Sequence, residues 1–236
     1  MVLSRITIAA LVATALASPA VAQGAFQAAP SGPVAGGQIS PEALYQGWRS
    51  RQVIGGVVHR PNGDPVGTVR DLIIGADGRI AAIVVEGGGA SGVPDVVYRI
   101  PWDQVGLTPG RDGVAVNLAG SRNDPRYRLF QGTAEVTTAP REYRLTEIIG
   151  DYARLQTGYG FGIVTDAVFG PEGHLIAILV SRDAASGGGT YAFPYPGTTG
   201  RWEPQASYYG LPYVTDRQAA AAGVRIEPQR FRNSSM

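Results

Sequence analysis

Two aspartates at equivalent places in the chain are the residues whose type and position most suggest chemistry. Asp71 and Asp166 each end a Gly-x-Val-x-Asp pattern. Paired carboxylates are common in general acid–base catalysis. Each aspartate also lies in a run rich in Val and Ile, which is typical of a β-strand. A carboxylate in a strand most often accepts hydrogen bonds from backbone N–H groups or from an arginine such as Arg70 or Arg79. We interpret both aspartates as structural residues of two different domains.

The chain contains two histidines and no cysteine, and these counts restrict metal and nucleophilic chemistry. His59 and His174 have no second histidine nearby in the sequence. A zinc site needs further ligands, and a catalytic triad needs a nucleophile placed beside its histidine. Without cysteine there are no disulfides and no thiolate. We expect both histidines at the surface near turns, and we predict no metal, no cofactor and no catalytic residue.

Two glycine runs, an Asn-Gly-Asp turn and an Asp-Gly turn resemble ligand loops only superficially. The runs at 87–89 and 187–189 lack the lysine or the following helix that a phosphate-binding loop needs. The turns at 62–64 and 77–78 lack the acidic spacing and the closing glutamate of a calcium loop. We interpret the glycine runs as strand connections that require positive φ angles.

A Tyr-rich segment near the C-terminal end is the best candidate for a partner-binding surface. From Thr198 to Tyr213 the chain is rich in Gly, Pro and Tyr, and aromatic rings on a partly exposed surface are common at protein interfaces. The same rings would also serve to close the second domain and pack its last strands, and the sequence leaves both interpretations open. The candidate partner-binding residues are Trp202, Tyr208, Tyr209 and Tyr213.

Short runs rich in Val and Ile, separated by turn residues, predict the elements that position these side chains. Such spacing favours an all-β fold, either a small antiparallel barrel or a sandwich. The run RIAAIVV has no polar face, as expected for a strand covered on both sides. The predicted strands lie within residues 52–58, 66–74, 79–85, 95–100 and 114–118, with one more in the segment GTAEVTT at 132–138.

Capping residues predict two short helices outside these strands. Ser40 followed by Pro41 and Glu42 is typical of a helix start, here opening a helix that runs through Tyr45. Thr215 is the expected cap of a helix that runs through Ala222 and ends at Gly223.

The chain repeats itself without a gap at an offset of 95 residues. The alignment places Ile54 on Ile149 and Pro101 on Pro196, and it contains 15 identities over these 48 positions. The identities include the Gly, Val and Asp of the aspartate pattern. We therefore predict a tandem of one domain.

The first residues are typical of a secretory leader. One arginine, Arg5, precedes an apolar run from Ile6 to Ala17, and Ala20-Val21-Ala22 fits the cleavage pattern. The run is too short to span a bilayer, so we predict a periplasmic or secreted protein, cleaved after Ala22 and without a membrane anchor. The predicted organisation is a leader at 1–22, a flexible lead-in with the short helix at 23–47, domain 1 at 48–120, a connector at 121–144, domain 2 at 145–227 and a disordered tail at 228–236.

The first copy resembles the PRC-barrel domain family. The resemblance rests on an Ile-Gly strand at Ile54, the Gly-x-Val-x-Asp-Leu pattern from Gly67 to Leu72, an Asp-Gly turn, a Val-rich strand, a Gly-rich loop and a Pro-Trp end at Pro101-Trp102. The second copy is similar but has Ala167 in place of the leucine and lacks the tryptophan. The resemblance implies two tandem small β-barrels of six strands each. It also implies an assembly or docking role and no shared enzymatic activity.

The chain as a whole is close to neutral, which bears on the kind of partner. It has 20 basic and 19 acidic residues, and removal of the leader with Arg5 leaves 19 of each. Such a balance gives no general attraction to nucleic acid. We therefore expect a non-catalytic binding or assembly module with a protein partner. The alternative is an enzyme or a small-ligand binder with a site between the two barrels.

Overall fold

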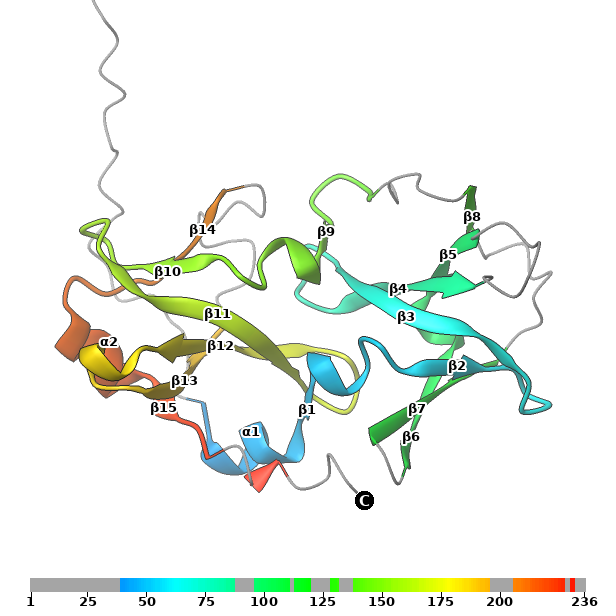
Figure 1. Ribbon diagram of the computed structural model, residues 1–236, viewed down its shortest axis with the longest axis horizontal. Coiled ribbons are helices and arrows are strands. Elements are labelled where there is room, and N and C mark those ends of the chain that lie inside the picture. Colours follow the sequence, from blue (N-terminus) through cyan, green and yellow to red (C-terminus); the bar gives the residue numbers. More distant parts are fainter. Residues whose placement is uncertain are drawn as a thin grey trace, which may run out of the picture.

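The structure is a computed structural model that describes residues 39–87, 96–110, 113–119, 128–131, 138–195, 206–227 and 230–231. The predicted leader, the lead-in before residue 39, most of the predicted strand at 132–138 and Trp202 lie outside these ranges. The described residues form two sheets that lie side by side along the long axis of the molecule (Figure 1). The all-β prediction with two tandem barrel-like units is therefore confirmed. The two sheets contain eight and seven strands among the described residues, and not the six strands each that the resemblance implied.

The first sheet contains eight strands within the described residues. Seven of them follow the order β6-β7-β2-β3-β4-β5-β8, and β9 pairs with β3 off this path. Their bounds are β2 (Val57–His59), β3 (Pro65–Ile74), β4 (Ile80–Gly87), β5 (Val96–Pro101), β6 (Val105–Gly110), β7 (Gly113–Leu118), β8 (Arg128–Gln131) and β9 (Tyr143–Arg144).

The second sheet repeats this plan with seven strands in the described part of the chain. Its order is β14-β10-β11-β12-β13-β15, and β1 pairs with β11 off this path. In each sheet the first strand of the repeat also pairs in parallel with a later strand, β2 with β7 and β10 with β14. The bounds are β1 (Trp48–Arg49), β10 (Tyr152–Arg154), β11 (Gly160–Phe169), β12 (Leu175–Arg182), β13 (Gly189–Pro194), β14 (Tyr208–Gly210) and β15 (Val224–Arg225).

The helices are few and short, and both predicted α-helices are confirmed. Ser40 caps α1 (Pro41–Gln46), and Thr215 caps α2 (Asp216–Ala222) through a reciprocal capping box. Four single-turn 3₁₀ helices complete the described elements. They are η1 (Ser50–Gln52), η2 (Trp102–Gln104), η3 (Leu145–Glu147) and η4 (Ala184–Ser186).

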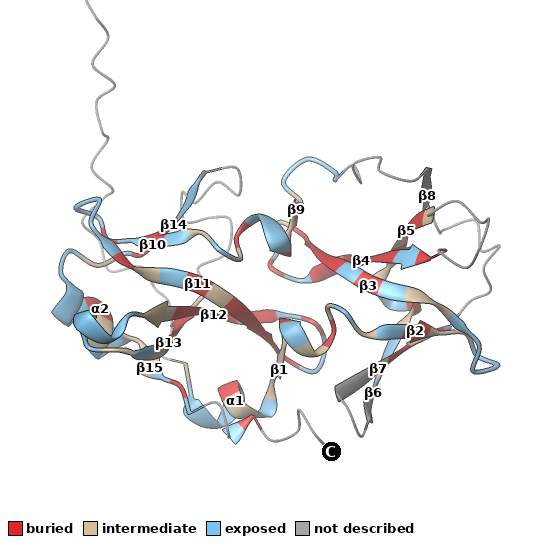
Figure 2. Cartoon of the chain, viewed as in Figure 1, coloured by how far each residue is buried: buried red, intermediate tan, exposed pale blue. Residues whose placement is uncertain are grey.

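The central hairpin of each repeat is buried on both faces. In β12, Ile178 and Val180 face one apolar cluster, while Ala177 and Leu179 face another. The predicted double-sided burial of β4 is confirmed in the same way. Figure 2 shows the buried residues gathered along β3, β4, β11 and β12. A bulge at the residue before Asp71, and again before Asp166, shifts the register. This extra residue explains why the long strand shows no clean polar and apolar alternation in the sequence.

Each repeat sends a short arm onto the other repeat. Arm 1, residues 48–52 (β1 and η1), precedes the first repeat, yet β1 pairs with β11 of the second. Arm 2, residues 143–147 (β9 and η3), precedes the second repeat, yet β9 pairs with β3 of the first. The arms are themselves related by the offset of 95, since Trp48 corresponds to Tyr143. Figure 1 shows both arms at the junction of the two sheets.

The tips of the two central hairpins also meet at this junction. The backbone N–H of Ile80 donates to the carbonyl of Gly173 at 2.9 Å, and that of Leu175 donates to the carbonyl of Gly78 at 2.8 Å. These two bonds are equivalent under the offset. One apolar cluster runs through both repeats, so the two sheets share a continuous core.

Candidate functional site

Asp166 is held by arm 1, which comes from the other end of the chain. Its side chain is 1% exposed and accepts hydrogen bonds from Arg49 Nε at 2.8 Å and from Ser50 Oγ at 2.5 Å. Arg51 contributes its Nε at 2.8 Å and its backbone N–H at 3.4 Å. The backbone N–H of Ala167 adds a further bond at 2.9 Å. Two guanidinium groups therefore compensate this buried charge.

Arm 2 holds Asp71 at the position equivalent to Asp166, through a hydroxyl and backbone N–H groups in place of guanidinium groups. Its carboxylate accepts from the hydroxyl of Thr146, from the backbone N–H of Thr146 at 3.2 Å, and from the backbone N–H of Leu72 at 2.7 Å. Burial raises the pKa of Asp71, and the hydrogen bonds from Thr146 and Leu72 oppose this shift only in part. Arg144 is near enough to favour the charged form slightly.

We name the junction formed by the two arms and the two hairpin tips the seam. At the seam, Trp48 stacks on Phe169 and Trp102 at ring-centroid distances of 4.8 and 6.0 Å, and its Nε1 donates to the carbonyl of Gly170 at 3.0 Å. On the arm 2 side, the hydroxyls of Tyr143 and Tyr195 are 2.9 Å apart. Burial raises the pKa of Tyr143 far above its usual range, so this phenol stays protonated.

Both aspartates lie at the seam, where their carboxylates accept hydrogen bonds from the arms and from the adjacent backbone. The expectation that each would accept bonds from backbone or arginine is met, with one correction. The side-chain partners come from the arm of the opposite repeat, and the next residue in the chain adds a local backbone N–H in each case. The suggested Arg70 and Arg79 are not among the partners that the structure shows for Asp71. The sequence could not show this, because nothing local in a strand indicates which repeat its neighbour belongs to.

The two histidines and the second glycine run lie at strand ends or beside turns. His174 is exposed and forms an isolated β-bridge with Arg79, and His59 is half-buried at the end of β2. Within the described ranges, no group of three or more His, Asp or Glu side chains is arranged to hold a metal ion. Gly187, Gly188 and Gly189 all have positive φ, between 60° and 95°, as predicted for a strand connection. In the first run the prediction is wrong for Gly87, which ends β4 without a positive φ, and Gly88 and Gly89 lie outside the described residues.

The four candidate partner-binding residues do not share one environment. Tyr209 is 1% exposed and belongs to the shared core, so it offers no contact surface and is removed from the candidate set. Tyr213 is half-buried against Phe193, with ring centroids 5.9 Å apart. Tyr208 is 40% exposed. Trp202 lies outside the described residues.

Tyr208 belongs instead to an exposed row that crosses three neighbouring strands. Tyr208 of β14 is in register with Tyr152 of β10, which is in register with Ile163 of β11. Their exposed fractions are 40%, 57% and 44%, and residues in register on adjacent strands point to the same face. We name these three residues the tyrosine strip. The guanidinium of Arg154 stacks over the Tyr208 ring at 5.2 Å.

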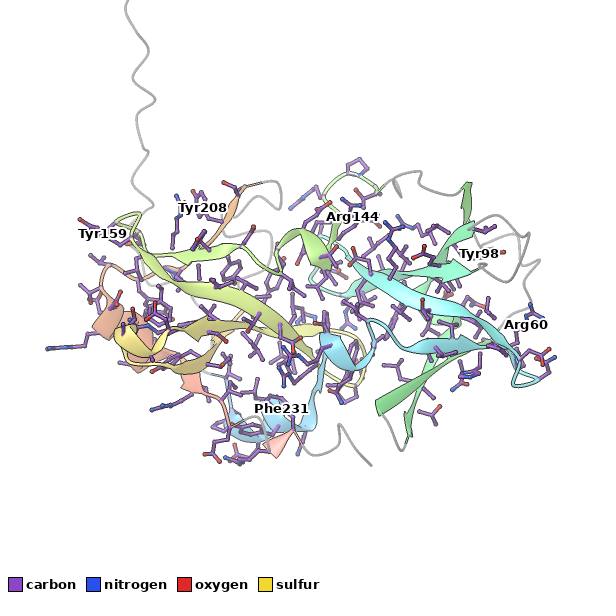
Figure 3. All side chains as sticks on the ribbon, in the orientation of Figure 1. Arg60, Tyr98, Arg144, Tyr159, Tyr208 and Phe231 are labelled. Atoms are coloured by element: carbon purple, nitrogen blue, oxygen red, sulfur yellow. The ribbon has the colours of Figure 1, made fainter. Side chains whose placement is uncertain are left out.

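A further exposed tyrosine lies at the same end of the molecule, and polar groups extend the row of paired residues on its other side. Tyr159, at the tip of the β10–β11 hairpin, is 76% exposed, and Figure 3 shows it at the same end of the molecule as Tyr208. On the other side, Ile163 is in register with Ser181. The Ser181 hydroxyl lies 2.9 Å from that of Thr190.

Within the described residues, the first repeat lacks an equivalent row of aromatic side chains. The residues equivalent to Tyr152 and Ile163 are Val57 and Thr68, and Thr68 is in register with Glu86. Sequence reasoning missed Tyr152 and Ile163. The signal that could have found them is the repeat alignment, where Val57 is replaced by tyrosine.

A shallow groove lies beside α2, away from the seam. It has a volume of about 580 Å³ and lies between α2 and the segment containing Pro212, Tyr213 and Val214. Its lining is apolar apart from Gln156 and Gln218. The groove shows no grouping of acidic or basic side chains that would suit catalysis.

The fold and the seam together define two small barrel-like β-domains in tandem, and each domain contacts the other through its arm. The family model described as PRC-barrel domain matches residues 51–118. This part of the chain, from η1 to the end of β7, is therefore a PRC-barrel domain, as the sequence predicted. Among curated proteins, no sequence matches this chain. Within the described residues, no helix is both long and apolar enough to cross a membrane.

Proposed function

We propose that the chain is an exported, non-catalytic binding or assembly module that contacts a protein partner through the tyrosine strip. The observation that carries this proposal is the strand register of Tyr208, Tyr152 and Ile163, which places three exposed apolar side chains side by side. Exposed apolar groups scattered singly are ordinary, whereas a contiguous group marks a contact surface. Tyrosines are also enriched among the residues that dominate binding energy.

The surroundings of the strip support a protein partner over RNA. Arg154 is engaged with the Tyr208 ring, and the residues in register along the row, from Tyr208 to Thr190, carry no charge. A surface that binds RNA needs several unpaired basic groups along a backbone path. A neutral aromatic row is suited instead to the uncharged part of a protein interface.

The non-catalytic part of the proposal is supported by the seam. An enzyme between the two barrels that used the paired aspartates would need Asp71 or Asp166 to face a substrate. Each carboxylate is instead occupied by a 3₁₀ turn from the opposite repeat. One cluster of buried apolar residues includes members of both repeats.

The second repeat is part of the same proposal. Its strands β10 to β13 reproduce the pairing of β2 to β5, including the bulge before the aspartate. We assign it as a second, diverged PRC-barrel. The proposed export rests on the leader at 1–22.

The experiment is capture of partners by the tagged, full-length exported chain in its native compartment, followed by photo-crosslinking. The test variant is Tyr152→Ser combined with Tyr208→Ser. The matched control is Val57→Ser, which changes the equivalent, 44% exposed position in the first repeat. We expect the double variant to lose at least about ten-fold in capture, since two contact residues are each worth more than about 1 kcal/mol. Equal capture by the double variant and the control would overturn the proposal.

A further inference from the structure

The outer face of the second sheet carries a second apolar surface, separate from the shared core. It is formed by four aliphatic residues from three neighbouring strands, each fully buried. We name this surface the socket. Its residues are Val168 of β11, Ala177 and Leu179 of β12, and Ala192 of β13.

The first repeat carries the same four positions. Subtracting the offset of 95 from the socket residues gives four aliphatic residues, all 0–2% exposed, that form a cluster of their own. They are Ile73, Ala82, Val84 and Val97. A sheet face in contact with water would carry polar residues at these positions. The repeat unit is therefore built with an outer face that something must cover.

In the second repeat the cover comes from the two ends of the described chain. Leu44 of α1 is buried in the socket together with Ile226 and Phe231. Tyr45 of α1 packs on Phe231 with ring centroids 4.8 Å apart, and the backbone N–H of Glu227 donates to the Tyr45 hydroxyl at 3.0 Å. Figure 3 shows Phe231 beside this helix. Phe231 lies in the tail predicted to be disordered, so this part of the tail is packed.

The helix α1 is attached to the socket by one fully buried side chain and by the half-buried Ile39 and Tyr45, whereas arm 1 also bonds to a buried carboxylate. The helix has six residues, and Leu44 is its one buried side chain. A helix this short is not stable by itself in water. Pro41, Glu42 and Ala43 are exposed, whereas the chain beyond Gly47 is fixed by Trp48 and by the bonds of arm 1 to Asp166.

Gly47 lies at the boundary between α1, which has few buried contacts, and arm 1, which is fixed at the seam. A side chain there would meet the carbonyl of Phe169 at 2.6 Å and Val168 Cγ1 at 2.8 Å, so the backbone passes tightly over β11 at this point. Opening upstream of Gly47 would free α1 and leave the seam intact. Local opening of this kind is typical of chain segments with few buried contacts.

We infer that α1 is an intramolecular ligand of the socket and that the socket takes, in trans, the α1 of a second copy of this chain. The donated helix presents Leu44 and Tyr45 to the socket of the other molecule as it does within its own. Exchange of an identical element between copies needs no new contact surface. Such exchange would join exported chains to one another, whereas the tyrosine strip remains free for a different partner.

The test uses the full-length chain and a labelled peptide of residues 38–47, QISPEALYQG. The variant Leu44→Asp removes the apolar side chain of the cis ligand and leaves every socket residue unchanged. Fluorescence polarisation is expected to show saturable binding of the peptide to Leu44→Asp, at least ten-fold tighter than to the wild-type chain, whose socket is filled. The same peptide carrying Leu44→Asp is the matched control and is expected not to bind.

The second copy is tested by sedimentation velocity of the wild-type chain mixed with Leu44→Asp. We expect a 1:1 complex that excess peptide dissociates. Equal peptide affinity for variant and wild type, or no complex in the mixture, overturns the inference. If Leu44→Asp unfolds, as judged by near-UV circular dichroism, the variant Tyr45→Ala replaces it, because Tyr45 borders the socket and the four socket residues are untouched.

Discussion

Thr146 of the second repeat donates both its hydroxyl and its backbone N–H to Asp71 of the first repeat. The converse contact joins Ser50, ahead of the first repeat, to Asp166 of the second. Each domain thus accepts the lead-in turn of the other. The two repeats resemble a pair of exchanged subunits joined into one chain, and their folding should be coupled.

The two aspartates should respond differently to removal of their charge. Asp166→Asn leaves Arg49 and Arg51 without their carboxylate, and we expect it to lower the free energy of unfolding by about 2–3 kcal/mol. Asp71 has no arginine hydrogen bond among its partners. Asn at that place can still accept from Thr146, so Asp71→Asn should cost less than about 1 kcal/mol. Urea unfolding at pH 7 measures both, and equal losses would contradict the described geometry.

The free energy of unfolding should depend on pH in a way that reflects the raised pKa of Asp71. Burial raises its pKa in the folded chain above that in the unfolded chain, so folding disfavours the charged form. As pH falls from 7 through the folded pKa toward the unfolded value near 4, the wild type should gain stability relative to Asp71→Asn. Urea titrations of both proteins across this range test the sign. A wild-type advantage that shrinks on acidification would show that Asp71 behaves as an ordinary ion-paired carboxylate.

Two equivalent glycines should be indispensable because strands pass close to them. A side chain at Gly67 would meet the carbonyl of Glu86 at 2.1 Å, and one at Gly162 would meet the carbonyl of Ser181 at 2.4 Å. Each substitution to alanine should cost about 2 kcal/mol or more, since the backbone must shift. Gly106→Ala is the control, because its nearest neighbour would be 3.8 Å away. Thermal unfolding of the three variants gives the comparison, and similar midpoints would refute it.

Much of the fold was predictable because strands and caps leave local signals. Val- and Ile-rich runs located β3, β4, β5 and β7, and Ser40 and Thr215 marked both helices. The predicted strand at 132–138 falls almost wholly outside the described residues, whereas the structure has β8 at Arg128–Gln131. The sequence also missed β6, because Pro109 and Gly110 read as turn residues.

The arms and the tyrosine strip were harder to predict for a physical reason. The pairings of β1 and β9 involve two residues each, and their partners depend on how the two repeats meet. Tyr208 and Tyr209 form one pair in sequence, but successive residues of a strand point to opposite faces. This alternation alone implies that one ring is inside and the other outside. Choosing between them requires the position of the core.

Double-mutant cycles across the seam test the exchange of arms most directly. Equilibrium unfolding of alanine variants is expected to give coupling energies of about 1 kcal/mol or more for Asp166 with Arg49 and for Asp71 with Thr146. The control pair is Asp71 with Arg49, which would be in contact if arm 1 stayed with its own repeat. Its two effects should add within about 0.5 kcal/mol. Coupling in the control pair, together with additivity in the two cross-repeat pairs, would contradict the account.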